Sequence, residues 1–293
     1  PTVTTELHKG ANDSGGAQVV TVGDSVPLGQ TMHDKGSVSG GNASFPGTMT
    51  FEFFNNKTCT GTPTDSATGV ALTSGVADPA LVESNLGAGD HAYHAKYVAG
   101  SDPNHVDSDF SSCEWFHVNT AKPSISTELH KGLTDSGAPV VVTVGSSVPL
   151  GQDMHDSATV TKSDSFALTG TVSFRFFKAG SCGGTADDTQ DNVALVSGVA
   201  DPGLAKSGLA AGDYAYQAKY VAGTDTNHSD SDWSSCENFT VNKSTPSVTT
   251  ELHKGANDTG GKQVLAVGGS VPLGQTMHDS ATVTNGGFAF SGR

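Results

Sequence analysis

The sequence predicts an all-β fold in which β-sandwich modules follow one another along the chain. Three observations support this prediction. A long segment recurs at a nearly constant interval, several stretches alternate apolar and polar residues, and Gly, Thr and Ser are abundant while only 15% of the residues are charged. Such alternation is typical of half-buried strands, and such a composition favours strands and turns over long helices.

The recurring segment divides the chain into three copies. It reads PTVTTELHKG from Pro1, PSISTELHKG from Pro123 and PSVTTELHKG from Pro246, so the interval is 122 and then 123 residues. Repeats of that length are whole domains in tandem and not the short units of a solenoid. We therefore expect one module at residues 1–122, a second at 123–245, and a partial third at 246–293 that holds only the N-terminal strands.

Two stretches of the second copy predict the sandwich. Residues 171–177 place Val172, Phe174 and Phe176 on one face, and residues 213–221 place three tyrosines and an alanine on one face. These four residues are Tyr214, Tyr216, Ala218 and Tyr220. Strands of this kind, separated by Gly, Asp, Asn and Pro turns and without an amphipathic helix, indicate two packed antiparallel sheets.

The third copy contains the opening strands alone. We expect strands at residues 263–267 and 271–277, and the sequence stops at Arg293, where the strand equivalent to residues 171–177 would begin. These strands would expose a hydrophobic face and unpaired backbone groups. Two explanations stay open: the chain was cut there, or another copy of the chain completes residues 246–293 by adding its strands. The second explanation predicts a filament, because a head-to-tail contact does not close on itself.

The linkers between copies are short. NTAKP at residues 119–123 and NKSTP at residues 242–246 each end in the proline that opens the next copy. Proline fixes its own φ and restricts the preceding residue to extended conformations. We therefore expect the modules to follow each other end to end as a rod with limited bending.

Residues 209–220 read LAAGDYAYQAKY and have the L-x-x-G-x-Y spacing of a tyrosine corner, in which a Tyr hydroxyl bonds to the backbone upstream. Tyr214 would be that residue. In the first copy His91 stands in its place, so the bond there would be weaker or made by the imidazole.

Together with SVPLGQTMHDSATVT (270–284) and GTVSFRFF (170–177), this run resembles the immunoglobulin-like repeats of large bacterial extracellular proteins. The resemblance covers nearly the whole chain and implies tandem immunoglobulin-like β-sandwich modules in a secreted or cell-surface protein. Such repeats commonly show Gly-Asp-x-x-Asn after the strand at 213–221, whereas this chain has AGTDTN. No ligand is implied, because these modules mostly serve as spacers.

The four cysteines occupy matching places in two copies. Cys59 and Cys113 are separated by 54 positions, and so are Cys182 and Cys236. This symmetry selects one disulfide per module, Cys59 with Cys113 and Cys182 with Cys236. Free thiols in a reducing cytosol are the alternative, but intracellular chains seldom space thiols as matched pairs.

A cluster of oxygen-bearing side chains follows the strand at residues 213–221 and its counterpart in the first copy. The residues are Asp102, Asn104, Asp107 and Asp109, and, with unchanged spacing, Asp225, Asn227, Asp230 and Asp232. Such oxygens suit calcium, so calcium is the cofactor that these loops suggest. The alternative is a solvated acidic loop, since neither the twelve-residue calcium loop nor its closing Glu is present. The cluster would lie at the end of its module that faces the preceding one.

Each copy also carries one His in ELHKG and one in MHD. They are His8 and His33, His130 and His155, and His253 and His278. Two neighbouring strands could bring such a pair together as a transition-metal site. The alternative is a pair of exposed strand histidines.

Composition and motifs exclude several functions. The formal charge of -15 opposes binding to nucleic acid or an anionic membrane, and no apolar run is long enough to span a membrane. Motifs of serine hydrolases, zinc proteases and P-loop enzymes are absent, which predicts a protein that is not an enzyme. We expect a disulfide-braced structural rod or fibre subunit. The alternative is an adhesin that binds glycan or protein through exposed loops, for which Trp115 and Trp233 would be the available aromatic residues.

Overall fold

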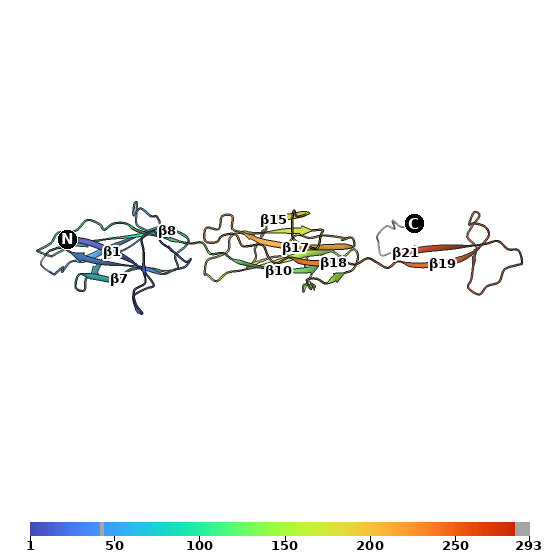
Figure 1. Cartoon of the computed structure of the whole chain (residues 1–293), viewed down its shortest axis with the longest axis horizontal. Helices are drawn as coiled ribbons and strands as arrows, with labels where there is room; N and C mark the ends of the chain where they lie inside the picture. Colours follow the sequence, from blue (N-terminus) through green and yellow to red (C-terminus); the bar gives the residue numbers. More distant parts are fainter. Residues whose placement is uncertain (42–43, 285–293) are drawn as a thin grey trace.

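The computed structural model describes residues 1–41 and 44–284, and these residues form strands, turns and loops. The fold is all-β, as the sequence predicted. Figure 1 shows the strands in three groups that succeed one another along the longest axis, in the order of the chain. None of the described residues belongs to a helix that could cross a membrane.

The first copy contains nine strands in two sheets. The strands are β1 (Thr2–Lys9), β2 (Val19–Val20), β3 (Ser25–Val26), β4 (Met32–Ser39), β5 (Thr48–Phe54), β6 (Asp65–Ala71), β7 (Val76–Glu83), β8 (Gly89–Val98) and β9 (Glu114–Val118). One sheet has the order β2-β1-β4-β7 and the other the order β3-β9-β8-β5-β6. All pairings are antiparallel except that of β3 with β9, which is parallel.

The second copy repeats this arrangement. Its strands are β10 (Ser124–Lys131), β11 (Val141–Val142), β12 (Ser147–Val148), β13 (Met154–Thr161), β14 (Thr171–Phe177), β15 (Asp188–Ala194), β16 (Val199–Ala200), β17 (Gly212–Val221) and β18 (Glu237–Val241). The sheet orders are β11-β10-β13-β16 and β12-β18-β17-β14-β15. The same sequence pattern has therefore produced the same strand order twice.

Both sheets of each copy contribute to its core. In the second copy Leu129 and Met154 come from one sheet, while Phe174, Tyr216 and Phe239 come from the other, and all belong to one buried cluster. Burial of a large apolar side chain contributes about 1.5–3 kcal/mol, so these residues are the main source of stability. The inward residues predicted for β14 and β17 are all buried.

Glycine is required where β14 begins. The Gly170 amide donates to the Tyr220 hydroxyl at 3.0 Å. A Cβ on Gly170 would lie 2.6 Å from that hydroxyl and would collide with the carbonyl of Val221. The glycine that opens GTVSFRFF therefore lets the strand approach Tyr220 closely, and Gly47 plays the same part in the first copy.

The predicted tyrosine corner is confirmed. The Tyr214 hydroxyl donates to the carbonyl of Ala210 at 3.0 Å. In the first copy the His91 Nε2 lies 3.0 Å from the carbonyl of Gly87, so the imidazole makes the equivalent bond.

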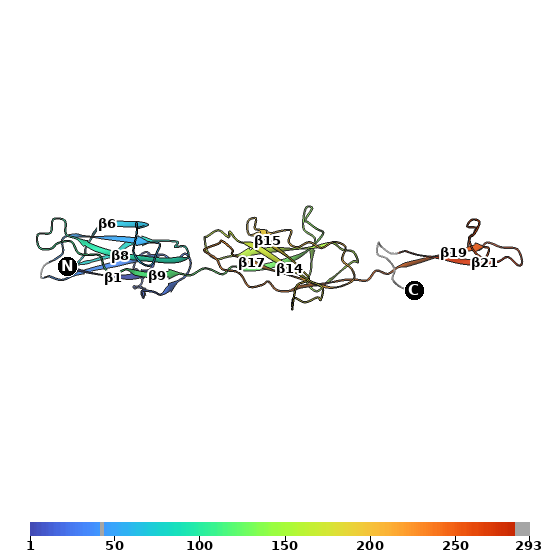
Figure 2. The same cartoon turned by 90° about the horizontal axis from the view of Figure 1, so that it is seen from above.

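The third copy has three described strands, β19 (Ser247–Lys254), β20 (Val264–Leu265) and β21 (Met277–Thr284), in one sheet of order β20-β19-β21. Figure 2 shows this copy as a single thin layer. The prediction of a strand at 271–277 is wrong, because the strand begins only at Met277 and residues 273–274 form a turn. Pro272 has no amide to donate, and Gly274 adopts a φ of +85°, so an extended ladder cannot run through them. The predicted strand at 263–267 is shorter than expected.

Candidate functional site

Both predicted disulfides are present. Cys59 is joined to Cys113 and Cys182 to Cys236. Each bond ties the loop between two strands of the five-stranded sheet to the segment that precedes the last strand of that sheet. Disulfides persist in oxidising compartments, so these bonds are compatible with an extracellular protein.

The acidic loop of the second copy is a hydrogen-bonded structure centred on Asp225. Its Oδ2 accepts from the Tyr220 hydroxyl at 2.7 Å, from the Thr169 amide at 3.0 Å and from the His228 ring at 2.8 Å. Its Oδ1 accepts from the amides of Asn227 and His228 at 3.0 and 3.2 Å. Burial alone would raise the pKa of Asp225, but the hydrogen bonds that it accepts lower it to about 2.

Asp102 holds the equivalent place in the first copy. Its carboxylate accepts from the Tyr97 hydroxyl at 2.7 Å, from the Asn104 amide at 2.8 Å and from the His105 ring at 2.6 Å. Burial opposes ionisation here too, yet these bonds lower the pKa of Asp102 to about 2. Asp102 and Asp225 are buried, whereas the other aspartates of the two loops are exposed, as a solvated acidic loop would have them.

The other residues of the predicted calcium cluster make separate contacts. Asp107 accepts from the Ala99 amide at 2.8 Å, and Asp230 accepts from the Ala222 amide at 3.0 Å. Asp232 pairs with Lys122 at 2.6 Å. Several of the oxygens that would bind calcium therefore already accept hydrogen bonds from the protein. Calcium at these loops stays a prediction.

The second acidic loop also touches the first copy, as its predicted position at the facing end of the module requires. The Asn227 side-chain oxygen accepts from the Ala88 amide at 2.9 Å. The backbone carbonyl of Asn227 accepts from the Ala121 amide at 2.9 Å. The Ala121 carbonyl in turn accepts from the Ser229 amide, also at 2.9 Å. Ala121 belongs to the linker, so the loop holds both the linker and the preceding copy.

Side chains that the sequence did not single out extend this contact. The Ser165 hydroxyl donates to the Asn85 side chain at 2.7 Å. The Phe166 ring lies against Gly29 and Gly87, where an added Cβ would be 3.9 and 3.8 Å from it. Nothing in the linear pattern identifies these partners, because they meet only when two copies are placed end to end.

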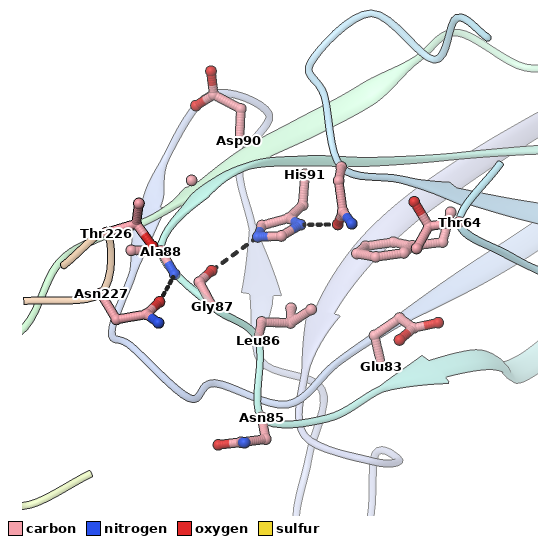
Figure 3. Close-up of a pocket in the computed structure, with 13 residues that line it drawn as sticks. Thr64, Glu83, Asn85, Leu86, Gly87, Ala88, Asp90, His91, Thr226 and Asn227 are labelled. Carbon is pink, nitrogen blue, oxygen red and sulfur yellow. Dashed lines mark hydrogen bonds between the residues drawn. The ribbon is translucent and has the colours of Figure 1, made fainter. Parts of the chain in front are cut away.

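A cleft of about 550 Å³ opens beside this junction. Figure 3 shows that most of its lining comes from the first copy and that Thr226 and Asn227 of the second copy close one side. His91 is already bonded within it to Asn55 and Gly87, and burial and the nearby Asp65 raise the pKa of Glu83 to about 7. One carboxyl with a raised pKa specifies no reaction, so we interpret the cleft as part of the junction.

The predicted histidine pairs also meet. His8 on β1 lies directly opposite His33 on β4, and their ring centroids are 5.1 Å apart. Both side chains are fully buried, so the interpretation of these residues as exposed strand histidines is wrong. Asp13 and Asp78, which sequence reasoning missed, complete the group. Their recurrence as Asp135 and Asp201 in the second copy was the signal that could have revealed them.

Comparisons with known proteins add little. No protein family and no curated protein matches the sequence. Among solved structures, the chain is similar to dimeric latent PorU from Porphyromonas gingivalis, with 14% identity and a TM-score of 0.25 over 87% of this chain and 26% of that chain. The chain thus spans about a quarter of the length of PorU. A similarity this weak carries no argument about fold or function.

Proposed function

We propose that the chain is a non-enzymatic structural segment of a secreted or cell-surface protein, in which immunoglobulin-like modules stand in line as a rod. The hydrogen-bonded junction between the first and second copies carries this proposal. An array of independent domains needs only a linker, whereas here the linker, the acidic loop and the preceding copy are bonded together.

The strand order supports the immunoglobulin-like part of the proposal. Taken in chain order, β1, β4 and β7 correspond to strands A, B and E of an immunoglobulin domain, and β5, β8 and β9 to strands C, F and G. The short β3 pairs in parallel with β9, as a second half of strand A that has switched sheets. The tyrosine corner at the start of β17 adds a local feature of the same fold.

The disulfides and the net charge support the proposed extracellular location. Two cross-links in a chain of this size are typical of oxidising compartments. A surface with a formal charge of -15 keeps such rods soluble and repels nucleic acid.

The junction offers a direct test with a matched control. Asn227→Ala removes the bond to Ala88, whereas Asn104→Ala makes the same change at the equivalent place of the first copy, away from this junction. Both variants keep the backbone bond from residue 104 or 227 to its aspartate.

We expect small-angle X-ray scattering of the wild-type chain to report an extended particle with restricted bending. Asn227→Ala should show increased flexibility and faster proteolysis within residues 119–123, and Asn104→Ala should match the wild type. Identical behaviour of the two variants, or a wild-type chain that bends freely, would contradict the rod.

The adhesive alternative stays a prediction. Trp233 packs over the Arg175 guanidinium at 3.8 Å, and Trp115 lies over Gly23, where an added Cβ would be 3.2 Å from the ring. Both side chains are half-buried, so the structure gives each of them a packing role. Binding of a glycan array by the wild-type chain, lost in Trp233→Ala, would support adhesion.

Completion of residues 246–293 by another chain also stays a prediction. Val248, Leu252 and Val283 of the described third copy are exposed by 61%, 46% and 44%. Apolar side chains on an unpaired sheet face favour association. Polymers that persist after deletion of residues 246–293 would exclude this mode of assembly.

A further inference from the structure

The His/Asp group of the first copy gathers four side chains from separate segments. His8 comes from β1, His33 from β4, Asp13 from the loop after β1, and Asp78 from β7. One potential ligand atom from each lies within 4.8 Å of all the others. The two rings are fully buried, while the carboxylates are about one quarter exposed and line the solvent side of the group.

The hydrogen bonds of His33 identify which of its nitrogens is free. Its Nδ1 lies 2.7 Å from the carbonyl of Gly10, and a carbonyl can only accept, so Nδ1 carries a proton. In the neutral ring Nε2 then presents a lone pair. Nε2 is buried without a hydrogen-bond partner and faces Asp13 Oδ1 at 3.6 Å and Asp78 Oδ1 at 3.4 Å. Two carboxylate oxygens thus face a buried ring nitrogen that has no hydrogen-bond partner.

His8 has the complementary arrangement. Its Nε2 lies 3.0 Å from a carboxylate oxygen of Glu6 and its Nδ1 lies 2.9 Å from Asp13, and both carboxylates accept hydrogen bonds. An ion that replaced the proton on Nδ1 would leave the Nε2–H donating to Glu6. Histidines that bind metal usually donate their other ring N–H to a carboxylate or a backbone carbonyl, which fixes the ring. Glu6 and Gly10 supply those two acceptors.

The distances from His33 to the two carboxylates fit a small divalent ion. Zinc binds His nitrogen and Asp oxygen at about 2.0–2.2 Å, so neighbouring ligand atoms of a tetrahedral site lie about 3.4 Å apart. The distances from His33 Nε2 to both carboxylates agree with that value. Two carboxylates also balance the charge of a divalent cation beside two neutral imidazoles.

The second copy builds the same group. His130 lies opposite His155, and Asp135 and Asp201 complete the set. The His155 Nδ1 lies 2.8 Å from the carbonyl of Gly132, and its Nε2 is buried without a hydrogen-bond partner. That nitrogen faces Asp135 at 3.5 Å and Asp201 at 3.2 Å.

The described residues of the third copy supply three of the four side chains of such a group, namely His253, His278 and Asp258. Its Asp258 side chain is 42% exposed, against 24% for Asp13. A site with three protein ligands and greater exposure should bind the same ion more weakly.

We propose that each complete His₂Asp₂ group, His8-Asp13-His33-Asp78 and His130-Asp135-His155-Asp201, is a binding site for a divalent transition-metal ion of the zinc type. The ion bridges three strands of the four-stranded sheet in the first copy. The disulfide of that copy braces the five-stranded sheet. Each sheet of the sandwich therefore has a cross-link of its own.

The experiment uses the whole chain, freed of metal by chelation and dialysis, with zinc and cobalt as probes. Native mass spectrometry and titration calorimetry should detect two tightly bound zinc ions per chain, one for each complete group. Cobalt should give the intense visible absorption of a tetrahedral site. The melting temperature should rise with zinc, because an ion that binds only the folded state stabilises it.

Asp78→Asn and Asp201→Asn should each remove one tight zinc ion, and the double variant should remove both along with the visible cobalt spectrum. Asp90→Asn is the matched control, since Asp90 contacts His117 on the same copy outside the group, and it should keep both ions. The metal-free melting temperatures show that the variants fold. A wild-type chain without tight zinc and without the tetrahedral cobalt spectrum, or a double variant that binds as the wild type does, would overturn the proposal.

Discussion

Removal of the Asp225 side chain should strongly destabilise the second copy. Its carboxylate accepts five hydrogen bonds, and the residue is only 7% exposed. Asp225→Ala leaves those donors without an acceptor in a site that water enters poorly. The Tyr220 hydroxyl and the His228 ring are among them, and both residues are at most 2% exposed.

The expected loss follows from the number and kind of bonds. A hydrogen bond to a charged group contributes about 1.5–3 kcal/mol, but bonds that share one acceptor are not additive. Removing one partner from a buried charged network typically costs about 3–5 kcal/mol, and this is the loss in unfolding free energy that we expect for Asp225→Ala. Asp225→Asn keeps one acceptor oxygen and should lose less.

Asp232→Ala is the matched control in the same loop. The Asp232 side chain is 88% exposed, and its one described partner is Lys122. Exposed ion pairs contribute about 0–1 kcal/mol, so this variant should remain close to the wild type.

Tryptophan fluorescence during urea unfolding measures the effect. The chain has two tryptophans, one in each of the first two copies. In a Trp115→Phe background, Trp233 alone reports on the second copy. A loss below about 1 kcal/mol for Asp225→Ala, no larger than that of an exposed ion pair, would refute the buried network.

Acid should weaken the contribution of Asp225. Its pKa is lowered from 3.8 to about 2 in the folded chain, so the unfolded state binds the proton more readily. The stabilisation is therefore complete well above pH 3.8 and is lost as the pH falls towards 2. The difference between the wild type and Asp225→Asn should shrink over that range.

Three further predictions concern other parts of the chain. Replacing Cys182 and Cys236 by Ser should lower the unfolding free energy of the second copy by about 4 kcal/mol, because the bond closes a loop of 54 positions. Mass spectrometry of an unreduced digest of the wild-type chain checks the pairing, and four alkylatable thiols would contradict it. Burial, and then the charge of Glu237, raise the pKa of Asp156 well above 3.8. The folded chain therefore loses stability relative to the unfolded chain as the pH rises from about 4 through the folded-state pKa. Asp156→Asn should flatten this decline in the urea midpoint between about pH 4 and 8, and an unchanged slope would count against the buried carboxyl. Calcium added to chelated protein should raise the melting temperature if the loops bind it, because the ion would stabilise the folded state. A rise that is lost in Asp225→Asn would support the calcium site, and an unchanged melting temperature would contradict it.

Sequence patterns predicted the features that depend on local spacing. Alternation over residues 171–177 and 213–221 identified β14 and β17 and their buried faces, and the matched spacing of the cysteines identified both disulfides. The tyrosine corner followed from a spacing of six residues ending at Tyr214. The strand predicted at 271–277 is wrong, because Pro272 has no amide to donate and Gly274 lies in a turn, and these override the local alternation.

Other features depended on how distant segments meet. The histidines were recognised in the sequence, but their burial and the two aspartates beside them were not. The sequence predicted that the acidic loops bind calcium, but it did not show that Asp102 and Asp225 accept bonds from Tyr97 and Tyr220. The partners of Asn227 across the junction also had no signal in the linear pattern.

The sequence by itself determined the all-β class, the inward faces of the strands and the cysteine pairing, because side-chain alternation and repeat symmetry are properties of spacing along the chain. Tertiary structure decided which polar groups share a site. His8 and His33 meet because β1 and β4 pair in one particular register, and Asp78 joins them because β7 lies beside β4. That register depends on packing two sheets around a common core, so the chemistry of the group could be known only once the fold was complete.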